Sequence, residues 1–166
     1  MLVLGIDPGT AVTGYGLVRS DKGTALVPVS FGCIRTEAAW PLTRRLQVIY
    51  REITRIIQEF KPDAVAVEEL FFSRSVQTTA AVGYSRGIAL LAATEAKCPV
   101  FEYPPAVVKR AVTGQGRATK EQVQYMVQHL LKLKTPPAPD DVADALAVAI
   151  CHLHTALTEK AQVAKD

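Results

Sequence analysis

The chain has 166 residues, of which 49% are hydrophobic and 21% are charged, and its formal net charge is +3. That composition is typical of one soluble globular domain, and the length leaves little room for a second. No stretch approaches the roughly 18 uncharged apolar residues of a membrane span, and we expect no secretory signal. The three cysteines form no CxxC pair, which indicates reduced thiols in a cytoplasmic protein without membrane association.

The N-terminal part of the chain predicts three antiparallel strands followed by a helix. A first apolar run stops at the breakers Pro8 and Gly9, and the sequence Asp21-Lys22-Gly23 is a hairpin signal between the next two runs. Beyond Pro41, apolar residues recur at helical spacing. We expect strands at residues 2–7, 13–20 and 25–35 and an amphipathic helix at residues 42–60.

The rest of the chain alternates short strands with helices. Strands are expected at residues 64–67 and 100–103, and helices at residues 75–96, from Pro104-Pro105 through Lys109, from the capping-box pattern at Thr119–Gln122, and from about Asp140 to Leu157. This order predicts a single α/β domain over residues 1–157, whose later strands are parallel crossovers. Residues 158–166 are expected to form a polar, flexible C-terminal tail.

Two acidic residues stand at the ends of buried strands. Asp7 ends the first predicted strand and Glu68 follows the fourth, and in open α/β sheets this edge is where ligands bind. The two acids converge if their strands are neighbours. Either acid alone has a structural explanation, since Asp before Pro-Gly is also a common turn former.

A second pair of acids lies near the start of the last predicted helix. Asp141 and Asp144 are three residues apart and share a helix face, with Asp141 at the edge of the apolar stripe and Asp144 farther around. The structural alternative is that both stabilise the helix dipole, with Asp140 as the N-cap.

Four carboxylates without paired histidines form the ligand set of a hard divalent cation, Mg²⁺ or Mn²⁺. Two ions about 3.5–4 Å apart would support in-line phosphodiester hydrolysis, one activating a water and the other stabilising the leaving 3′ oxygen. Asp7, Glu68, Asp141 and Asp144 therefore predict a metal-dependent nuclease with two ions per active site.

Positive charge gathers in local groups along the chain. These groups are Arg44 with Arg45, Arg74, Arg86, Lys109 with Arg110, and Arg117 with Lys120. A basic surface around an acidic pocket suits a polyanion that is cut with the help of metal ions. About half of these side chains are equally well explained as solvated residues on helix faces.

Three motifs together resemble the bacterial Holliday junction resolvase family, RuvC. They are Leu4–Gly16 (LGIDPGTAVTGYG) followed by Gly32–Thr36 (GCIRT), Ala66–Glu68 with Phe71, and Asp141–Ala147 (DVADALA). The resemblance spans nearly the whole chain. It implies an RNase H-like fold, with a five-stranded mixed sheet flanked by helices, in which three antiparallel N-terminal strands precede the parallel crossovers.

The resemblance also implies a function. A homodimer would bind four-way junction DNA in recombination and repair, together with the RuvAB branch-migration complex. Each subunit would nick one of two like-oriented strands with Mg²⁺ or Mn²⁺ at a short T-containing sequence, leaving 5′-phosphate and 3′-OH ends. The predicted helix 75–96 is rich in small residues and could allow close approach of two subunits, or equally well close packing on its own sheet.

The family's site residues are carried over position by position. Asp7, Glu68, Asp141 and Asp144 fall on its catalytic acids, Lys109 and Lys120 on its functional lysines, and Phe71 on an aromatic residue that stacks with bases. Lys120 would act in catalysis. From the basic groups, Arg74 and Arg117 are further DNA-binding candidates. Glu69 departs from the family pattern, which has Gln there, and adds a negative charge beside the site.

Three alternatives remain open from the sequence. The GIDxGT pattern also occurs in actin-like and Hsp70-like nucleotide-binding proteins, although those need two such domains. A junction-binding module without catalysis would gain nothing from clustered acids. A related RNase H-like nuclease acting on RNA or on other branched DNA is the nearest rival.

Overall fold

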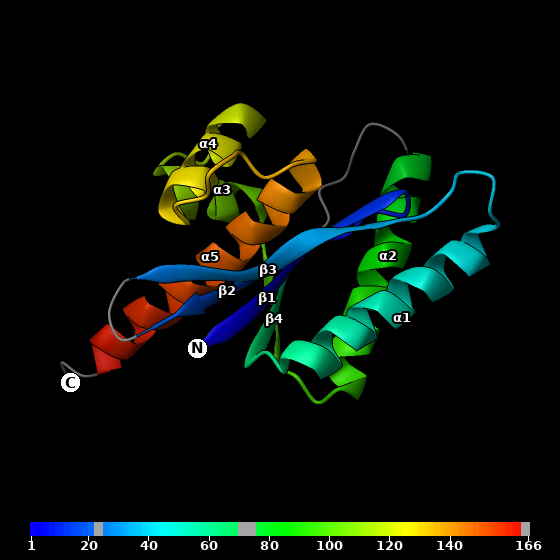
Figure 1. Cartoon of the computed structure of the whole chain (residues 1–166), viewed down its shortest axis with the longest axis horizontal. Coiled ribbons are helices and arrows are strands. Elements are labelled where there is room, and N and C mark those ends of the chain that lie inside the picture. The colour runs from blue at the N-terminus through cyan, green and yellow to red at the C-terminus, as the bar shows by residue number, and fades with distance from the viewer. Residues whose placement is uncertain (22–24, 70–75, 164–166) are drawn as a thin grey trace.

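A five-stranded sheet with the strand order β3-β2-β1-β4-β5 forms the centre of the computed structural model, which describes residues 1–21, 25–69 and 76–163 (Figure 1). For residues 76–79 and 159–163 only the backbone is described. The strands are β1 (Leu2–Asp7), β2 (Val12–Ser20), β3 (Leu26–Arg35), β4 (Ala64–Glu68) and β5 (Val100–Tyr103). The helices are α1 (Leu42–Phe60), α2 (Val76–Glu95), α3 (Pro105–Thr113), α4 (Lys120–Leu130) and α5 (Asp140–Val163).

The pairing of the strands confirms the expected mixed sheet. Strands β1, β2 and β3 pair antiparallel, whereas β4 runs parallel to β1 and β5 runs parallel to β4. The crossover through α1 brings β4 beside β1, and the crossover through α2 brings β5 beside β4, so that strands far apart in the sequence become neighbours.

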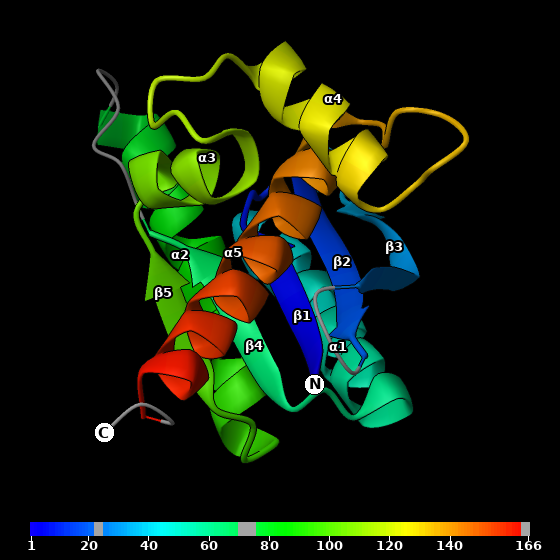
Figure 2. The ribbon, with the colours of Figure 1, turned by 90° about the vertical axis from the view of Figure 1, so that its left-hand side faces the viewer.

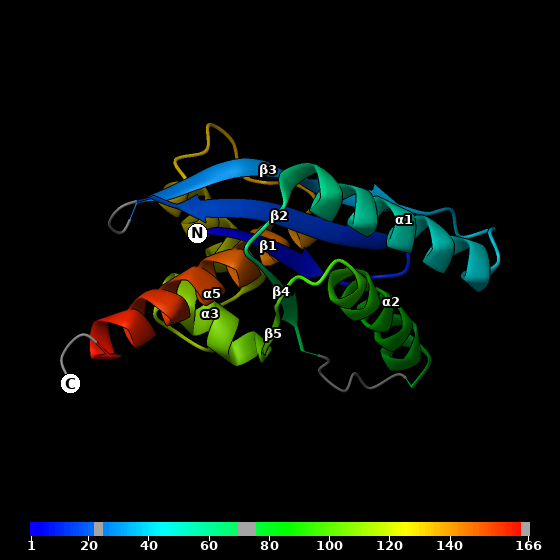
Figure 3. The same ribbon diagram turned by 90° about the horizontal axis from the view of Figure 1, so that it is seen from below.

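Helices cover both faces of the sheet. Helix α5 lies across one face, with α3 and α4 beside its N-terminal half (Figure 2). Helices α1 and α2 lie together on the other face (Figure 3). Each face has its own apolar core, one around Leu146 and Ile150 of α5 and one around Ile49 and Ile53 of α1.

Side chains of the two central strands alternate between these cores. In β1, Val3 packs in the core of α5, whereas Leu4 and Ile6 pack in the core of α1 and α2. In β4, Ala66 faces α5 and Val67 faces the opposite core. Because strand side chains alternate with a period of two, the residues that end these strands, Asp7 and Glu68, are directed to the α5 face.

Two helices run farther than the sequence predicts. Helix α3 continues past Lys109 to Thr113, where Gly114 ends it in the left-handed conformation at φ 79°. Helix α5 continues past Leu157 to Val163, so residues 158–163 are helical where the sequence predicts the end of the helix at Leu157. Residues 159–162 (EKAQ) are good helix formers with no Gly or Pro to stop them.

The capping box that the sequence predicts at the start of α4 is present. The side chain of Thr119 accepts from the backbone N–H of Gln122, and the side chain of Gln122 accepts from the backbone N–H of Thr119. This cap fixes Lys120 as the first residue of α4. Within the described residues, no helix is long and apolar enough to cross a membrane.

Candidate active site

Two acids from neighbouring strands form one side of the site. The register pairs Ile6 of β1 with Val67 of β4, so the next residues along the two parallel strands are Asp7 and Glu68. Both side chains are partly buried. The structure thus confirms that these acids meet at the C-terminal edge of the sheet.

Helix α5 brings the other two acids to this edge because glycines in β1 and β2 let its backbone come close. A Cβ atom added at Gly14 would lie 2.0 Å from the carbonyl oxygen of Asp141, and one added at Gly5 would lie 2.1 Å from that of Ala145. Only residues without a side chain fit such an approach. The glycine-bearing first motif therefore positions a helix that begins at Asp140, far along the chain.

These elements enclose a cavity of about 250 Å³. Its charged lining residues come from five segments of the chain: Asp7, Glu68, Lys109, Lys120 and Asp144. Pro105, Val108 and Val123 form its apolar wall, and the sequence did not identify them as residues of the site. The cavity thus combines three of the predicted acids with both predicted lysines.

The order of the two α5 acids differs from the helical-stripe argument. That argument puts Asp141 closest to the site, but Asp144 lines the cavity and Asp141 is not among its lining residues. The backbone of Asp141 packs on Gly14 of β2, whereas Asp144 lies where α4 meets α5, opposite Lys120. The apolar stripe of a helix indicates which side of the helix packs on the sheet. It does not indicate where a second helix packs against it.

Burial and mutual repulsion favour the protonated form of the acids. Burial raises the pKa of Asp7 well above its ordinary value, and the charges of Glu68, Asp144 and Asp141 raise it further. Burial also raises the pKa of Glu68 to about 7, with a further contribution from Asp144. The pKa of Asp144 is raised as well, again mainly by burial. Negative charge at this edge is therefore incompletely neutralised, which favours a cation.

Lys120 stands at the mouth of the cavity. Its Nζ lies 2.8 Å from Asp140 and 3.6 Å from Asp144. The pKa of Lys120 is raised, first by the hydrogen bond to Asp140 and then by the nearby acids. Asp140, which the sequence suggested as a helix N-cap, is the first residue of α5 and binds this lysine. Nothing in the local sequence pattern indicates that contact between α4 and α5.

The remaining predicted residues stand as follows. Phe71 and Arg74 lie outside the described residues. Arg117 is exposed and is not among the residues that line the cavity. Glu69 is also exposed and outside the lining, and its backbone N–H donates to the carbonyl of Tyr103 at 2.9 Å.

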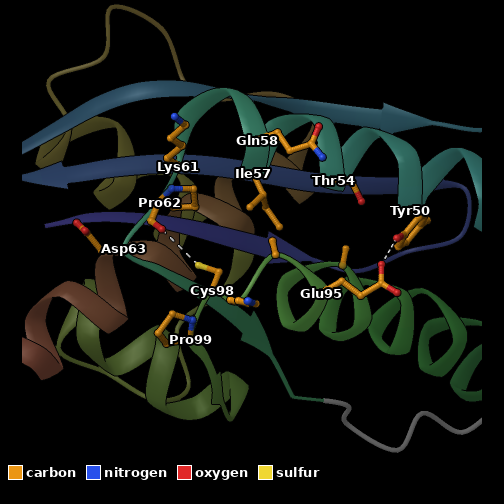
Figure 4. A pocket seen from close by; sticks show the side chains of 13 residues that line it. Tyr50, Thr54, Ile57, Gln58, Lys61, Pro62, Asp63, Glu95, Cys98 and Pro99 are labelled. Atoms are coloured by element: carbon orange, nitrogen blue, oxygen red, sulfur yellow. Dashed lines mark hydrogen bonds between the residues drawn. The ribbon is translucent and has the colours of Figure 1, made fainter.

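A larger pocket of about 800 Å³ lies at the opposite edge of the sheet, where the chain leads into β4 and β5 (Figure 4). There the hydroxyl of Tyr50 donates to Glu95, and the thiol of Cys98 donates to the carbonyl of Pro62 at 3.3 Å. These two hydrogen bonds join residues of the pocket lining to one another, and the described lining has no group of buried acids comparable to that of the first cavity.

The donor chemistry of the acidic cavity fits a divalent cation, since carboxylate oxygens are the preferred ligands of Mg²⁺ and Mn²⁺. Among the described residues, no three His, Cys, Asp or Glu side chains already have the arrangement of a metal-binding site. The assignment of a divalent cation to this cavity therefore rests on the carboxylate ligands and on their incompletely neutralised negative charge.

Comparisons with known proteins identify the family to which the chain is similar. The family model for crossover junction endodeoxyribonuclease RuvC matches residues 3–152. The protein of that name from Desulfitobacterium hafniense is 55% identical over 155 residues, covering 93% of each chain. The structure of T. thermophilus RuvC in complex with a Holliday junction substrate superposes with a TM-score of 0.89 at 39% identity, covering 94% of each chain. The yeast mitochondrial Holliday junction resolvase Ydc2 shares the fold, with a TM-score of 0.66 at 12% identity, covering 90% of this chain and 76% of its own.

Proposed function

Because the chain belongs to the RuvC family of crossover junction endodeoxyribonucleases, we propose that it resolves four-way DNA junctions by metal-dependent phosphodiester hydrolysis. The observation that supports this activity most directly is the cavity in which Asp7, Glu68 and Asp144 face Lys109 and Lys120. It lies at one end of an RNase H-like sheet. Partly buried acids beside two lysines suit a site that binds metal ions and a polyanion together.

Asp7, Glu68, Asp141 and Asp144 would hold the ions. Bound Mg²⁺ or Mn²⁺, as one or two ions, would supply an activated water and stabilise charge on the leaving 3′ oxygen. The raised pKa of Asp7, Glu68 and Asp144 supports this assignment, because a cation would relieve the repulsion among their charges. Ion binding would draw the carboxylates together.

The two lysines would act on the DNA. Lys120 has a side chain that is 63% exposed, so its ammonium group can reach a phosphate at the mouth of the cavity. There it would bind the scissile phosphate and reduce the negative charge that develops on it. Lys109, on the cavity wall, would add a second positive charge. Phe71, Arg74 and Arg117 would contact the DNA outside the cavity, with Phe71 stacking on bases.

A four-way junction has approximate two-fold symmetry, so paired nicks require two equivalent sites in a homodimer. Helix α2 has a surface suited to this contact, where Tyr84, Gly87 and Leu91 are exposed at helical spacing. Exposed large apolar side chains around a glycine allow two helices to pack closely. The nicked products would have 5′-phosphate and 3′-OH ends. The protein would act in recombination and repair together with the RuvAB complex.

Asp7→Asn tests the catalytic proposal. The variant should bind a synthetic four-way junction as the native protein does but lose cleavage by at least about a thousandfold, because a ligand of the reacting ions is gone. Cleavage is measured with Mg²⁺, Mn²⁺ or Ca²⁺ on the junction, a linear duplex and an RNA–DNA hybrid.

Asp21→Asn is the matched control, since Asp21 is an exposed acid paired with Arg19 and lies away from the cavity. It should cleave normally. Persistent junction cleavage by Asp7→Asn would refute the catalytic assignment. Cleavage of the RNA–DNA hybrid in preference to the junction would refute the proposal that four-way junctions are the substrate.

A further inference from the structure

The loop Pro8–Ala11 connects β1 to β2 directly after Asp7, and its carbonyl groups are held by hydrogen bonds. The carbonyl of Gly9 accepts from the hydroxyl of Thr13 at 2.6 Å. The carbonyl of Thr10 accepts from the hydroxyl of Thr36 and from Nε of Arg45. The carbonyl of Ala11 accepts from the backbone N–H of Thr36 at 3.0 Å. Three successive carbonyls are thus fixed from within the protein.

Besides Thr13 of β2, the donors to this loop are Thr36 and Arg45, which lie farther along the chain. Thr36 follows β3, and Arg45 lies in the first turns of α1. Nε of Arg45 also donates to the hydroxyl of Thr36 at 2.9 Å, so this hydroxyl accepts one hydrogen bond and donates another. Among the described residues Arg45 has no acidic partner within ion-pair distance. Its guanidinium group holds the loop.

The network bears on Asp7 because the backbone of Asp7 is fixed from two directions. Before Asp7, β1 is held by its ladders to β2 and β4. After Asp7 comes the buried Pro8, whose ring restricts the backbone, and then the loop held at Thr10. A shift of the loop would turn the carboxylate that ends β1.

We propose that Thr36 and Arg45 are positioning residues, which hold the loop Pro8–Ala11 so that the carboxylate of Asp7 keeps its place in the site. This assigns a role to the motif Gly32–Thr36, which contributes no residue to the lining of the cavity. The proposal rests on the proposed function, since Asp7 matters here as a metal ligand. Small displacements of catalytic groups can lower rates by about a hundredfold.

The test compares Thr36→Val with Thr36→Ser. Valine has the shape of threonine but lacks the hydroxyl, whereas serine keeps it. Single-turnover cleavage of a four-way junction by saturating protein should fall at least about tenfold in Thr36→Val and stay within about twofold in Thr36→Ser. The junction affinity should not change in either variant, because Thr36 does not line the cavity.

A binding measurement separates positioning from general damage. Calorimetric titration with Mn²⁺, without DNA, should show at least about threefold weaker binding to Thr36→Val and native binding to Thr36→Ser. Arg45→Gln should behave as Thr36→Val does, and it serves as the second variant if Thr36→Val does not fold. Arg55→Gln on the same helix is the control, because Arg55 binds Glu52 and Glu59 and should leave both measurements unchanged.

Native cleavage and native Mn²⁺ binding by both Thr36→Val and Arg45→Gln would overturn the proposal. Equal impairment of Thr36→Val and Thr36→Ser would also overturn it, because the hydroxyl would then not be the active group. Failure of the proposed function would look different, since the native protein itself would not cut the junction or Asp7→Asn would still cut it.

Discussion

Glu68 links the chemistry of the site to the stability of the protein. Burial raises its pKa from 4.5 to about 7 in the folded chain, so the native state holds this proton more tightly than the unfolded state does. The stability from this proton is present below about pH 4.5 and is lost as the pH rises through about 7. At higher pH the buried charge destabilises the metal-free protein by at most about 3 kcal/mol.

Glu68→Gln should therefore stabilise the metal-free protein near pH 8. Glutamine has a similar shape and no charge, so thermal unfolding in EDTA should occur several degrees higher than in the native protein, at about 2–4 °C per kcal/mol. The difference should vanish below about pH 4.5, where Glu68 is itself neutral. Equal unfolding temperatures near pH 8 would contradict the raised pKa.

The sequence identified Asp7 and Glu68 for a physical reason that the structure confirms. Both end short apolar runs, and an acid at that position lies at the carboxyl end of a strand, which is the edge of the sheet where ligands bind. Asp144 was harder to place, because its neighbour in the site, Lys120, belongs to α4. The contact of Lys120 with Asp140 and Asp144 depends on how two helices pack, which the spacing of residues along one helix does not determine.

Among the elements, the packing of α5 on β1 and β2 depends on the glycines beneath it. Gly14→Ala should destabilise the protein by about 1–3 kcal/mol, because the added methyl group would meet the backbone of Asp141. The displaced start of α5 should also slow junction cleavage. Denaturant unfolding and single-turnover cleavage measure the two effects.

Gly32→Ala makes the same chemical change on the neighbouring strand and is the control. Its methyl group would meet the hydroxyl end of the Tyr15 side chain at 3.0 Å, which can move aside more easily than a backbone. A smaller loss of stability is expected there. If the two variants lose equal stability, the close approach of α5 at Gly14 is not the cause of the destabilisation in Gly14→Ala.

Helix and strand positions were predictable where one periodicity continues over the whole element. The α1 pattern gives residues 42–60 in the sequence and Leu42–Phe60 in the structure. The ends of α3 and α5 were wrong because an apolar pattern fades before the helix does. The left-handed Gly114 stops α3, and polar helix formers extend α5 beyond its apolar face.

At the scale of the whole molecule, the exposed surface of α2 is where we expect the subunit contact of the proposed homodimer. Leu91→Glu should convert the dimer to a monomer at micromolar concentration, because Leu91 is 47% exposed in the single chain and would be buried by a partner. Light scattering measures the change, and paired junction nicks should become single nicks. Val29→Glu on the edge strand β3 replaces another exposed apolar side chain and should leave the dimer intact.

A native chain that is monomeric under these conditions would contradict the dimer, and a dimeric Leu91→Glu variant would contradict its place on α2. The arrangement of the sheet itself was predictable, since hairpins pair neighbouring strands and right-handed crossovers place β4 beside β1. The meeting of five separate segments at one cavity followed only from the family resemblance, because the spacing of residues along one element does not determine which helices pack together.

The alternation of side chains in β1 and β4 makes the site depend on odd and even positions. Val3, Gly5 and Asp7 share one side of the sheet, and so do Ala66 and Glu68. One residue inserted before Asp7 within β1 would turn its carboxylate toward α1 and α2, whereas two inserted residues would return it to the side of α5. The length of these strands can therefore change only by an even number of residues if the acids are to stay on the α5 side. A site moved to another protein must keep this odd or even position as well as the identity of each residue.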